Sequence, residues 1–312
     1  MIVTVTLNPS IDKTLTLKEL KVGGINRADS MNLDPGGKGV NVSRALAAMG
    51  VPTKAILICG ELGRDWMERA LEHRGIKHDI IESGDTVRSN LTIVHDGGKV
   101  TKINEAGSPL TELDLVAVRE SIKLAQATWV VLAGRSNPGL PETTYRDLAK
   151  FSKEIGARVA VDTSGPELKH ALEANAVDLI KPNQHELAEL VGRPLLTIHD
   201  VISAAREVID GGVEMVVCSL GADGAILITQ STAVHCEPAH PVKGTPVGAG
   251  DILLGTFLGA GADEEALTVG VKWSAASVPL EGTSVPTAAQ AEAMEVKVNR
   301  NLDNERHLVE VE

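Results

Sequence analysis

The feature that most constrains this fold is the alternation of short apolar runs with amphipathic segments through the middle of the chain. Each run is rich in Val, Ile, Leu and Ala, and the longer segments repeat apolar residues at helical spacing. Strands separated by helices in this way indicate βαβ units and a parallel sheet. We expect strands at 128–134, 157–162, 177–183 and 213–220, and helices at 111–127, 141–156 and 198–212.

The composition agrees with a buried parallel sheet. Apolar residues make up 43% of the 312 positions and aromatic residues only 2%, so the core must be built from aliphatic side chains. Parallel strands covered by helices on both faces have this character. No linker interrupts the pattern, and we expect a single domain over 1–312. Ligands of such sheets bind outside the carboxyl ends of the strands.

The first third of the chain has a different pattern. Residues 1–7 read as a strand, and short alternating stretches lie at about 12–34 and 87–105. The Gly97-Gly98 pair is a hairpin signal within the second stretch. We expect these two stretches to form a small, separate antiparallel sheet attached to the main domain. Between them, a glycine-rich loop leads into a helix within 35–50.

Charge and cysteine usage exclude several classes of protein. The net charge of −12 argues against a general surface for nucleic acid or anionic membranes. The three cysteines are far apart in sequence, which indicates neither a disulfide framework nor a metal site. No apolar run approaches the ~18 residues of a membrane helix, and the first residues lack the plan of a signal peptide. These observations together favour the cytoplasm.

The segment "PVGAGD" joins a turn of small residues to a carboxylate. Gly248, Ala249 and Gly250 precede Asp251, and an apolar run follows. Such a turn exposes backbone amides at a helix start, where an anion can bind. Two interpretations of Asp251 stay open here. It could simply complement the helix dipole, or it could handle a proton beside a bound anion.

Three other loops carry similar pairs of interpretations. "GGKGVN" either makes a tight turn with a solvated Lys38 or brings backbone and cation to a ligand. "KPNQHE" has the Asn183 and Glu186 spacing of a capping box, and its acid could also face a hydrated Mg²⁺. "SLGADG" reads as a strand end with a glycine turn. No segment fits the P-loop or the dinucleotide fingerprint.

In this order, "PGGKGVNVSRAL", "IKPNQHEL", "SLGADGA" and "PVGAGD" resemble the ribokinase-like (PfkB) family of carbohydrate kinases. The resemblance spans nearly the whole chain and is closest to the sugar-phosphate branch. It implies a three-layer α/β/α fold with a mostly parallel central sheet and a small β-sheet lid. It also implies phosphoryl transfer from ATP with Mg²⁺. Fructose 1-phosphate is the favoured acceptor, and tagatose 6-phosphate and fructose 6-phosphate are alternatives. A catalytically weak sensor of sugar phosphate or nucleotide is a further alternative.

The resemblance also assigns roles by position. Asp251 would be the base, and the amides of Gly248, Ala249 and Gly250 would stabilise the transferring phosphoryl group. The sugar phosphate would contact Asp12, Arg27, Gly36, Gly37, Lys38, Asn41 and Arg88. The nucleotide and magnesium side would include Lys181, Asn183, Glu186, Ser219, Leu220, Gly221, Ala222, Asp223, Gly224 and Gly250. Thr245, Val247 and Gly282 would offer carbonyls to K⁺, and the lid would form a homodimer.

One departure concerns the sugar side. Relatives of this type usually read G-S-L-P-P-G where this chain reads "GRSNPG", so Arg135 stands in place of a small serine. A guanidinium at that point could bind a phosphate or could alter the choice of substrate. A dehydrogenase would instead need a glycine fingerprint after the first strand, where "TLNPSID" stands.

Overall fold

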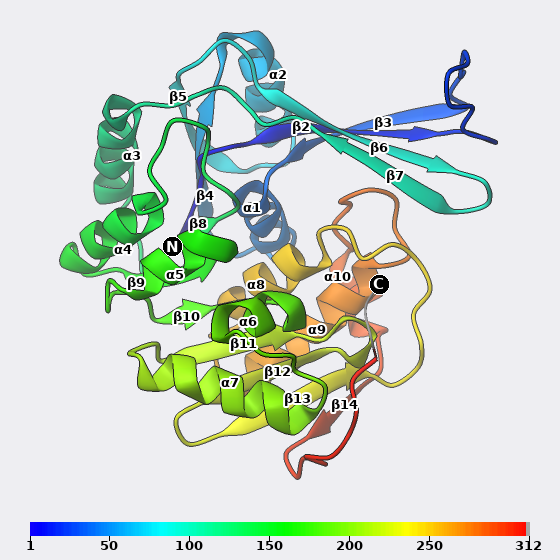
Figure 1. Cartoon of the computed structure of the whole chain (residues 1–312). Helices are drawn as coiled ribbons and strands as arrows, with labels where there is room; N and C mark the ends of the chain where they lie inside the picture. The colour runs from blue at the N-terminus through cyan, green and yellow to red at the C-terminus, as the bar shows by residue number, and fades with distance from the viewer. Residues whose placement is uncertain (310–312) are drawn as a thin grey trace.

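The aliphatic runs form the strands of a central sheet. The computed structural model describes residues 1–309, and within them a ten-stranded sheet carries helices on both faces, beside a separate four-stranded sheet (Figure 1). The central order is β14-β13-β12-β11-β10-β9-β8-β1-β4-β5. Its strands are β1 (Ile2–Thr6), β4 (Thr53–Cys59), β5 (Lys77–Glu82), β8 (Trp129–Ala133), β9 (Arg158–Asp162), β10 (Leu179–Ile180), β11 (Met215–Ser219), β12 (Ala225–Thr229), β13 (Ala233–Pro238) and β14 (Val296–Asn299).

Neighbouring strands from β5 to β11 pair in parallel, and β12, β13 and β14 extend the sheet with antiparallel pairs. The α-helices are α1 (Lys38–Ala48), α2 (Glu61–Glu72), α3 (Glu112–Ala125), α4 (Thr144–Glu154), α5 (Gly165–Leu172), α6 (Gln184–Val191), α7 (Ile198–Asp210), α8 (Ala249–Gly259), α9 (Glu264–Ser277) and α10 (Ala288–Glu292). The three-layer fold expected from the sequence is therefore confirmed.

The core lies on both faces of the central sheet because successive side chains of a strand point to opposite faces. In β8, Val130 and Leu132 join the core that includes residues of α3 and α4, whereas Trp129 and Val131 join the core of α1 and α8. Burial on both faces explains why the strands read as continuous apolar runs rather than as alternating ones.

The expected elements are present with shifted bounds. The helix expected at 141–156 begins at Thr144, because Pro141 starts a turn in which the Thr144 amide donates to the Pro141 carbonyl. The strand expected at 177–183 shortens to two residues, and the chain then turns toward the site. The sequence pattern did not reveal β4, α2 and β5. These elements lie between α1 and the two later strands of the four-stranded sheet.

The second sheet, called the small sheet below, has the order β3-β2-β6-β7. Its strands are β2 (Ser10–Thr16), β3 (Ser30–Gly36), β6 (Arg88–His95) and β7 (Lys99–Asn104). A separate sheet from these parts of the chain is confirmed, but the expectation that it is antiparallel is wrong in its centre. Strands β2 and β3 form one antiparallel pair, and β6 and β7 form another from a distant part of the chain. The two pairs join through β2 and β6, which run in the same direction and therefore pair in parallel.

Helices α1 and α8 lie against each other and carry the two glycine-rich loops at their starts. Close approach depends on Gly255, where an added Cβ would stand 2.8 Å from the Val42 carbonyl oxygen. Helix α8 is apolar around its whole circumference because it is buried in the core. Across residues 1–309, no helix is long and apolar enough to cross a membrane. Cys59, Cys218 and Cys236 are buried and unpaired.

Candidate active site

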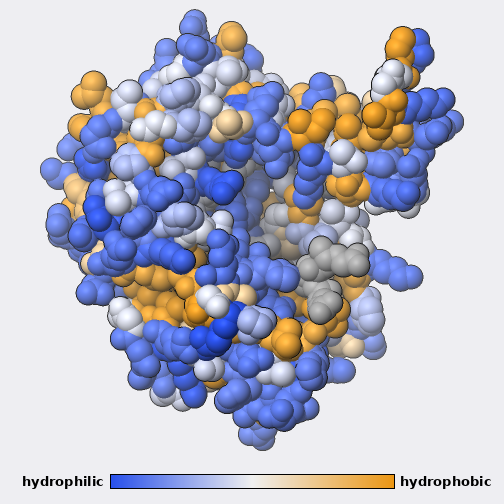
Figure 2. Space-filling view, in the orientation of Figure 1, coloured by the Kyte–Doolittle hydropathy of each residue, from blue (hydrophilic) through white to orange (hydrophobic). Residues whose placement is uncertain are grey.

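The residues expected to act in chemistry converge at the carboxyl ends of the central strands. Strand β9 ends at Asp162 and β11 ends at Ser219. Strand β10 ends one residue before Lys181. The helices α1 and α8 begin nearby with Lys38 and Ala249. Figure 2 shows a hollow between the main body and the protruding small sheet, with mostly hydrophilic residues along it. This is the edge where ligands of parallel α/β sheets bind.

Asp251 is buried, with 7% of its surface exposed. Gly248 caps α8 with a φ of 77°, and no side chain provides a cap at this helix start. The Asp251 carboxylate instead accepts a hydrogen bond of 2.9 Å from Nδ2 of Asn41 on α1. A residue that only complemented its own helix dipole would not need a buried partner 210 positions away. The structure therefore favours the chemical interpretation of this residue.

The pKa of Asp251 is raised from its ordinary value to about 6. Burial is the largest cause, and the nearby Asp162 carboxylate adds to it, whereas Lys38 and the Asn41 hydrogen bond lower the pKa. A carboxylate with a pKa near neutrality is a suitable general base, because it is ionised at physiological pH and still accepts a proton readily.

Asp162 joins two lysines across the site. Its Oδ1 lies 2.9 Å from Nζ of Lys38, and its Oδ2 lies 3.5 Å from Nζ of Lys181. Burial alone would raise the pKa of Asp162, but Lys181 and Lys38 outweigh burial and hold that pKa below its usual range. Burial alone would lower the pKa of Lys38, but Asp162 and Asp251 raise it. Lys38 therefore stays cationic.

Sequence reasoning treated Asp162 only as the end of a strand. The available signal was its position, because an acid at the carboxyl end of a parallel strand lies where sites are built. Lys38 was assigned to the sugar side alone, and the structure places it on the same Asp162 carboxylate as Lys181. Lys181 is also close to the glycine turn before α8, since a Cβ on Gly250 would stand 3.1 Å from its Nζ.

A cavity of about 400 Å³ contains most of the residues assigned to the nucleotide. It lies between the glycine turn, the start of α6 and the β11–β12 connection. Its apolar lining includes Val242, Val271 and Val278. The expected residues along it are Lys38, Lys181, Asn183, Glu186, Ser219, Leu220, Gly221, Ala222, Gly224, Gly248, Ala249, Gly250 and Asp251.

Asp223 does not line this cavity. Its carboxylate accepts hydrogen bonds from the Arg306 side chain (2.6 Å) and from the Val309 amide (2.8 Å). The side chain therefore binds the end of the described chain instead of lining the cavity, and its assignment to the nucleotide stays a prediction. The glycine turn itself is present as expected, with Gly221–Asp223 forming one turn of 3₁₀ helix before β12.

Asn183 and Glu186 form the expected capping box at the start of α6. The Asn183 side chain accepts from the Glu186 amide (2.8 Å), and the Glu186 carboxylate accepts from the Asn183 amide (2.9 Å). Both residues also line the cavity, so the cap does not exclude a role toward a ligand. Within residues 1–309, no cluster of three or more His, Cys, Asp or Glu side chains could hold a metal ion.

A second cavity of about 170 Å³ lies under the small sheet. Asp12 and Asn90 line it from the small sheet, and Thr245, Val247 and Gly282 line it from the opposite side. The loop before α8 thus separates the two cavities, with Pro246 in the larger one.

Asp12 accepts hydrogen bonds from Ser10 (2.7 Å) and Asn90 (3.0 Å), and burial raises its pKa. Only glycine fits at position 36, because a Cβ there would meet the Asp12 carboxylate at 2.2 Å. The two acids that the sequence assigns to the sugar side lie on different elements, Asp12 on β2 and Asp251 on α8.

The three assigned arginines differ in their surroundings. Arg88 donates to the carbonyl oxygens of Asn8 (3.2 Å) and Glu105 (3.1 Å), which hold it against the backbone. Arg27 lies in the exposed connection between β2 and β3 and lines neither cavity. Arg135 is exposed and makes no hydrogen bond or ion pair with any of residues 1–309.

The loop that carries Arg135 is fixed beside the site. The amide and hydroxyl of Ser136 donate to the Glu167 carboxylate at 3.2 and 2.5 Å. One residue earlier, a Cβ built on Gly134 would stand 3.8 Å from Cβ of Lys38. The guanidinium is therefore attached to an anchored backbone next to Lys38.

Comparison with known proteins places these features in a family. Residues 5–290 match the model of the pfkB family carbohydrate kinases. The chain is 33% identical over 306 residues to the 1-phosphofructokinase of Bacillus subtilis, which covers 96% of this chain and 100% of the relative. It is 36% identical over 269 residues to that of Xanthomonas campestris, covering 84% of each chain.

Solved structures give the same result. The phosphofructokinase-2 of Escherichia coli in complex with substrates and products superposes with a TM-score of 0.88 at 30% identity, covering 93% of this chain and 97% of the other. The same enzyme in complex with potassium has a TM-score of 0.88 at 29% identity, covering 93% and 96%.

Proposed function

The chain belongs to the pfkB family of carbohydrate kinases, and from that premise we propose that it transfers the γ-phosphoryl group of ATP to the 6-hydroxyl of fructose 1-phosphate. The product is fructose 1,6-bisphosphate. The observation that carries the proposal is the buried Asp251, held by Asn41 at the start of α8, in a chain whose full-length relatives are named 1-phosphofructokinase.

Asp251 receives the proton of the attacking hydroxyl. Its raised pKa, about 6, and its burial suit this role, because the acceptor must be ionised before the hydroxyl attacks. The start of α8 points its free amides at the transferring phosphoryl group, and Lys38 and Lys181 add positive charge. The Ala249 amide already donates to the Pro246 carbonyl at 3.2 Å, so the main donors at this turn are Gly248 and Gly250.

ATP occupies the larger cavity. The apolar side chains of Val242, Val271 and Val278 suit the flat face of the base. The β11–β12 turn borders the same cavity through Ser219, Leu220, Gly221, Ala222 and Gly224. The phosphates then extend toward Lys181 and the glycine turn. Mg²⁺, when bound, neutralises phosphate charge, and Glu186 with Asn183 would face it through water. A single carboxylate beside phosphates fits this ion, which keeps several waters.

The sugar phosphate lies between Asp12 and Asp251. Asp12 accepts hydrogen bonds from sugar hydroxyls, and the backbone at Gly36 and Gly37 allows close approach. We assign the 1-phosphate to Arg135, because its guanidinium is free and its loop lies next to Lys38, with Arg88 and Arg27 as further positive charge. A bidentate guanidinium matches phosphate geometry.

A monovalent cation, K⁺, is assigned to the carbonyls of Thr245, Val247 and Gly282. Thr245 and Val247 border the smaller cavity from the loop that leads into α8, and Gly282 borders it from the connection between α9 and α10. A cation there would stiffen the loop that presents the glycine turn. The potassium complex of the Escherichia coli neighbour is consistent with this assignment.

The small sheet is the proposed surface of a homodimer. Its cavity face carries Asp12, Asn90 and Asn104, whereas the alternate residues Leu91 and Ile103 lie on the opposite face. By the pairing register, Leu15, Met31, Leu33 and Ile93 share that opposite face. A second copy of this face would cover the apolar residues. The buried unpaired cysteines and the substrates of the reaction suit the cytoplasm.

The test is a substrate panel with MgATP, followed by release of ADP. We expect the highest kcat/KM for fructose 1-phosphate, compared with fructose 6-phosphate and tagatose 6-phosphate. Preference for either 6-phosphate would replace the substrate assignment, and no turnover with any sugar phosphate would refute the kinase proposal. The Arg135→Ser variant on the same panel should raise the KM for the sugar phosphate and leave that for ATP unchanged.

A further inference from the structure

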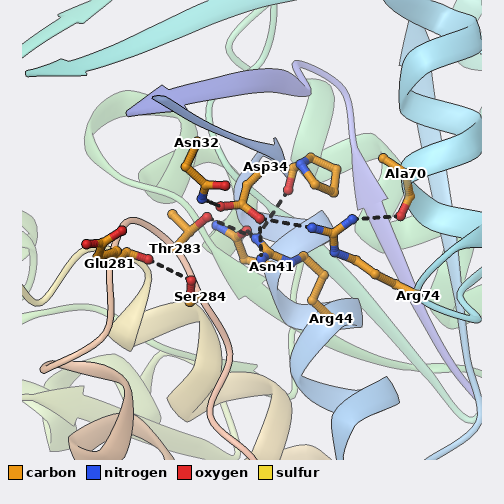
Figure 3. Close-up of polar contacts among 10 residues, drawn as sticks. Asn32, Asp34, Asn41, Arg44, Ala70, Arg74, Glu281, Thr283 and Ser284 are labelled. Atoms are coloured by element: carbon orange, nitrogen blue, oxygen red, sulfur yellow. Dashed lines mark hydrogen bonds and ion pairs between the residues drawn. The ribbon is translucent and has the colours of Figure 1, made fainter. Parts of the chain in front are cut away.

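A buried arginine lies directly behind the site. Arg44 on α1 is 7% exposed, and its guanidinium donates hydrogen bonds to four oxygen atoms (Figure 3). The acceptors are Pro35 O (3.3 Å), Asn41 Oδ1 (3.2 Å), Thr283 Oγ1 (2.9 Å) and Asp34 Oδ1 (3.0 Å). A buried guanidinium needs this many partners, because each unpaired donor would be costly to bury.

The bond to Asn41 fixes which way its amide points. The two ends of an asparagine amide differ, since the oxygen accepts and the nitrogen donates. Arg44 has only donors, so it selects the oxygen end. The nitrogen end then faces Asp251 and donates to its carboxylate at 2.9 Å. Without Arg44, the amide could rotate, and its oxygen would face the carboxylate and repel it.

The same guanidinium joins three separate parts of the molecule. Asp34 belongs to β3 of the small sheet, Asn41 to α1, and Thr283 to the connection between α9 and α10. Thr283 also packs against the glycine turn, with its Cβ 3.5 Å from the place a Cβ on Gly248 would take. Figure 3 shows these side chains pointing toward one another around Arg44.

We propose that Arg44 is a positioning residue for catalysis, which orients Asn41 toward Asp251 and ties the small sheet and the glycine turn to that carboxylate. The inference rests on the proposed role of Asp251 as base. It assigns the function to a side chain that touches neither sugar nor nucleotide.

Arg74 provides a matched control within the same cluster. It donates to the same oxygen, Asp34 Oδ1, at 3.0 Å, and to the Ala70 carbonyl, but it makes no bond to Asn41 or Thr283. Removing Arg74 therefore removes a positive charge from Asp34 and leaves the orientation of the amide intact.

The charges around Asp251 define what the pH profile should show. Lys38 faces it from α1, Asp162 from the end of β9, and Lys181 from the segment after β10, and all three stay in place in an Arg44 variant. Arg44 is a fourth charge within electrostatic range. Loss of its charge and of the Asn41 donor both favour the protonated carboxyl, so the acidic limb of kcat should move to higher pH.

The experiment compares Arg44→Met, Arg44→Lys and Arg74→Met with the unmodified full chain. We expect kcat to fall by ~10- to 100-fold in both Arg44 variants, since a displaced catalytic group costs about this much. The KM for ATP should not change. In Arg44→Met the acidic limb should shift upward, and Arg74→Met should keep both the rate and the limb. Thermal unfolding of each variant checks that it is folded, and Arg44→Lys keeps the charge in case the Met variant does not fold.

A double-mutant cycle separates orientation from general stability. If Arg44 acts through Asn41, then Arg44→Lys should lower kcat much less in an Asn41→Ala background than in the unmodified protein. Equal losses in both backgrounds would overturn the proposal. So would a folded Arg44→Lys variant with unchanged kcat, or an Arg74→Met variant with the same loss. If the Arg44 variants and Asp251→Asn all keep full kcat, the proposed base itself is wrong; if only Asp251→Asn loses activity, the base stands and Arg44 is dispensable.

Discussion

Asp251 shows how one carboxylate obtains a chemical role from its surroundings. Its helix position alone would give it a favourable interaction with a dipole, which is worth a fraction of a kcal/mol at an exposed site. Burial and the neighbouring Asp162 raise its pKa, while Lys38 and Asn41 keep the carboxylate in place. The combination gives a buried carboxylate that is ionised near pH 7, as the proposed base must be.

The first prediction removes this base. Asp251→Asn keeps the size of the side chain and its capacity to accept a hydrogen bond from Asn41, but it removes the proton acceptor. We expect kcat to fall by ~10²- to 10⁴-fold, the usual contribution of a positioned general base. ATP binding, measured by calorimetry, should persist. A variant with near-normal turnover would contradict the mechanism.

The second prediction concerns pH. Because the pKa of Asp251 is raised to about 6, the carboxyl becomes protonated and inactive as the pH falls through that value. We therefore expect kcat/KM for the sugar phosphate to be flat near neutral pH and to decline below about pH 6. The profile of kcat/KM reports groups of the free enzyme. A limb near pH 4 would show that burial of this carboxyl has no effect on its titration.

At the scale of elements, the site depends on how closely α1 and α8 approach. Asn41 and Asp251 lie on these two helices, and their hydrogen bond requires the helices to stay at their present separation. Gly255 sets that separation, because the Val42 carbonyl of α1 occupies the space a side chain would need. A feature of helix packing thus controls a catalytic contact.

The third prediction tests this link with Gly255→Ala. The added Cβ would meet a backbone oxygen at 2.8 Å, so the helices must separate. We expect a loss of about 1–3 kcal/mol of stability, typical of overpacking, together with a lower kcat. Thermal unfolding and steady-state kinetics measure both.

Gly259→Ala is the matched control for that variant. It lies in the same helix, but its Cβ would meet the side-chain ends of Leu46 and Met49, at 3.0 and 3.2 Å, which can move. Both substitutions gain the same helix propensity, so the difference between them reports the backbone contact. Equal effects would mean that the approach of the two helices does not limit activity.

At the scale of the whole molecule, the small sheet has two unlike faces. One borders the cavity with polar side chains, and the other carries apolar ones, including Met31 and Ile103, each 57% exposed. Exposed apolar residues gathered on one sheet face indicate a surface that another chain covers. In the proposed dimer, the face toward the site and the face toward the partner belong to the same strands, so association and substrate binding would share one element.

The fourth prediction is therefore about assembly. We expect the protein to be a dimer by light scattering at micromolar concentration, and Ile103→Lys to shift it toward the monomer, because a charge would be buried in the interface. Leu124→Lys on α3 is the control, since Leu124 is also exposed (76%) but lies on the main body. A monomeric unmodified protein, or a dimer unaffected by Ile103→Lys, would refute this interface.

The sequence by itself determined the alternating strands and helices, the glycine turns and the capping boxes. These features depend on local sterics and on apolar periodicity, which a short stretch of chain fully contains. It also placed Lys181 and the 219–224 turn at one edge, because parallel strands bring their carboxyl ends together. The expectation that Asp251 joins them came from the family resemblance. Its motifs were sufficient for the family.

Only the tertiary structure decided which polar groups meet. Four contacts join residues far apart in sequence: Asp162 between two lysines, Asn41 on Asp251, Arg44 on Thr283 and Asp223 on Arg306. The parallel pairing of β2 with β6 is likewise a long-range choice. The physical reason is burial: a polar side chain is forced to find a specific partner only when packing removes it from water, and packing is a property of the whole fold.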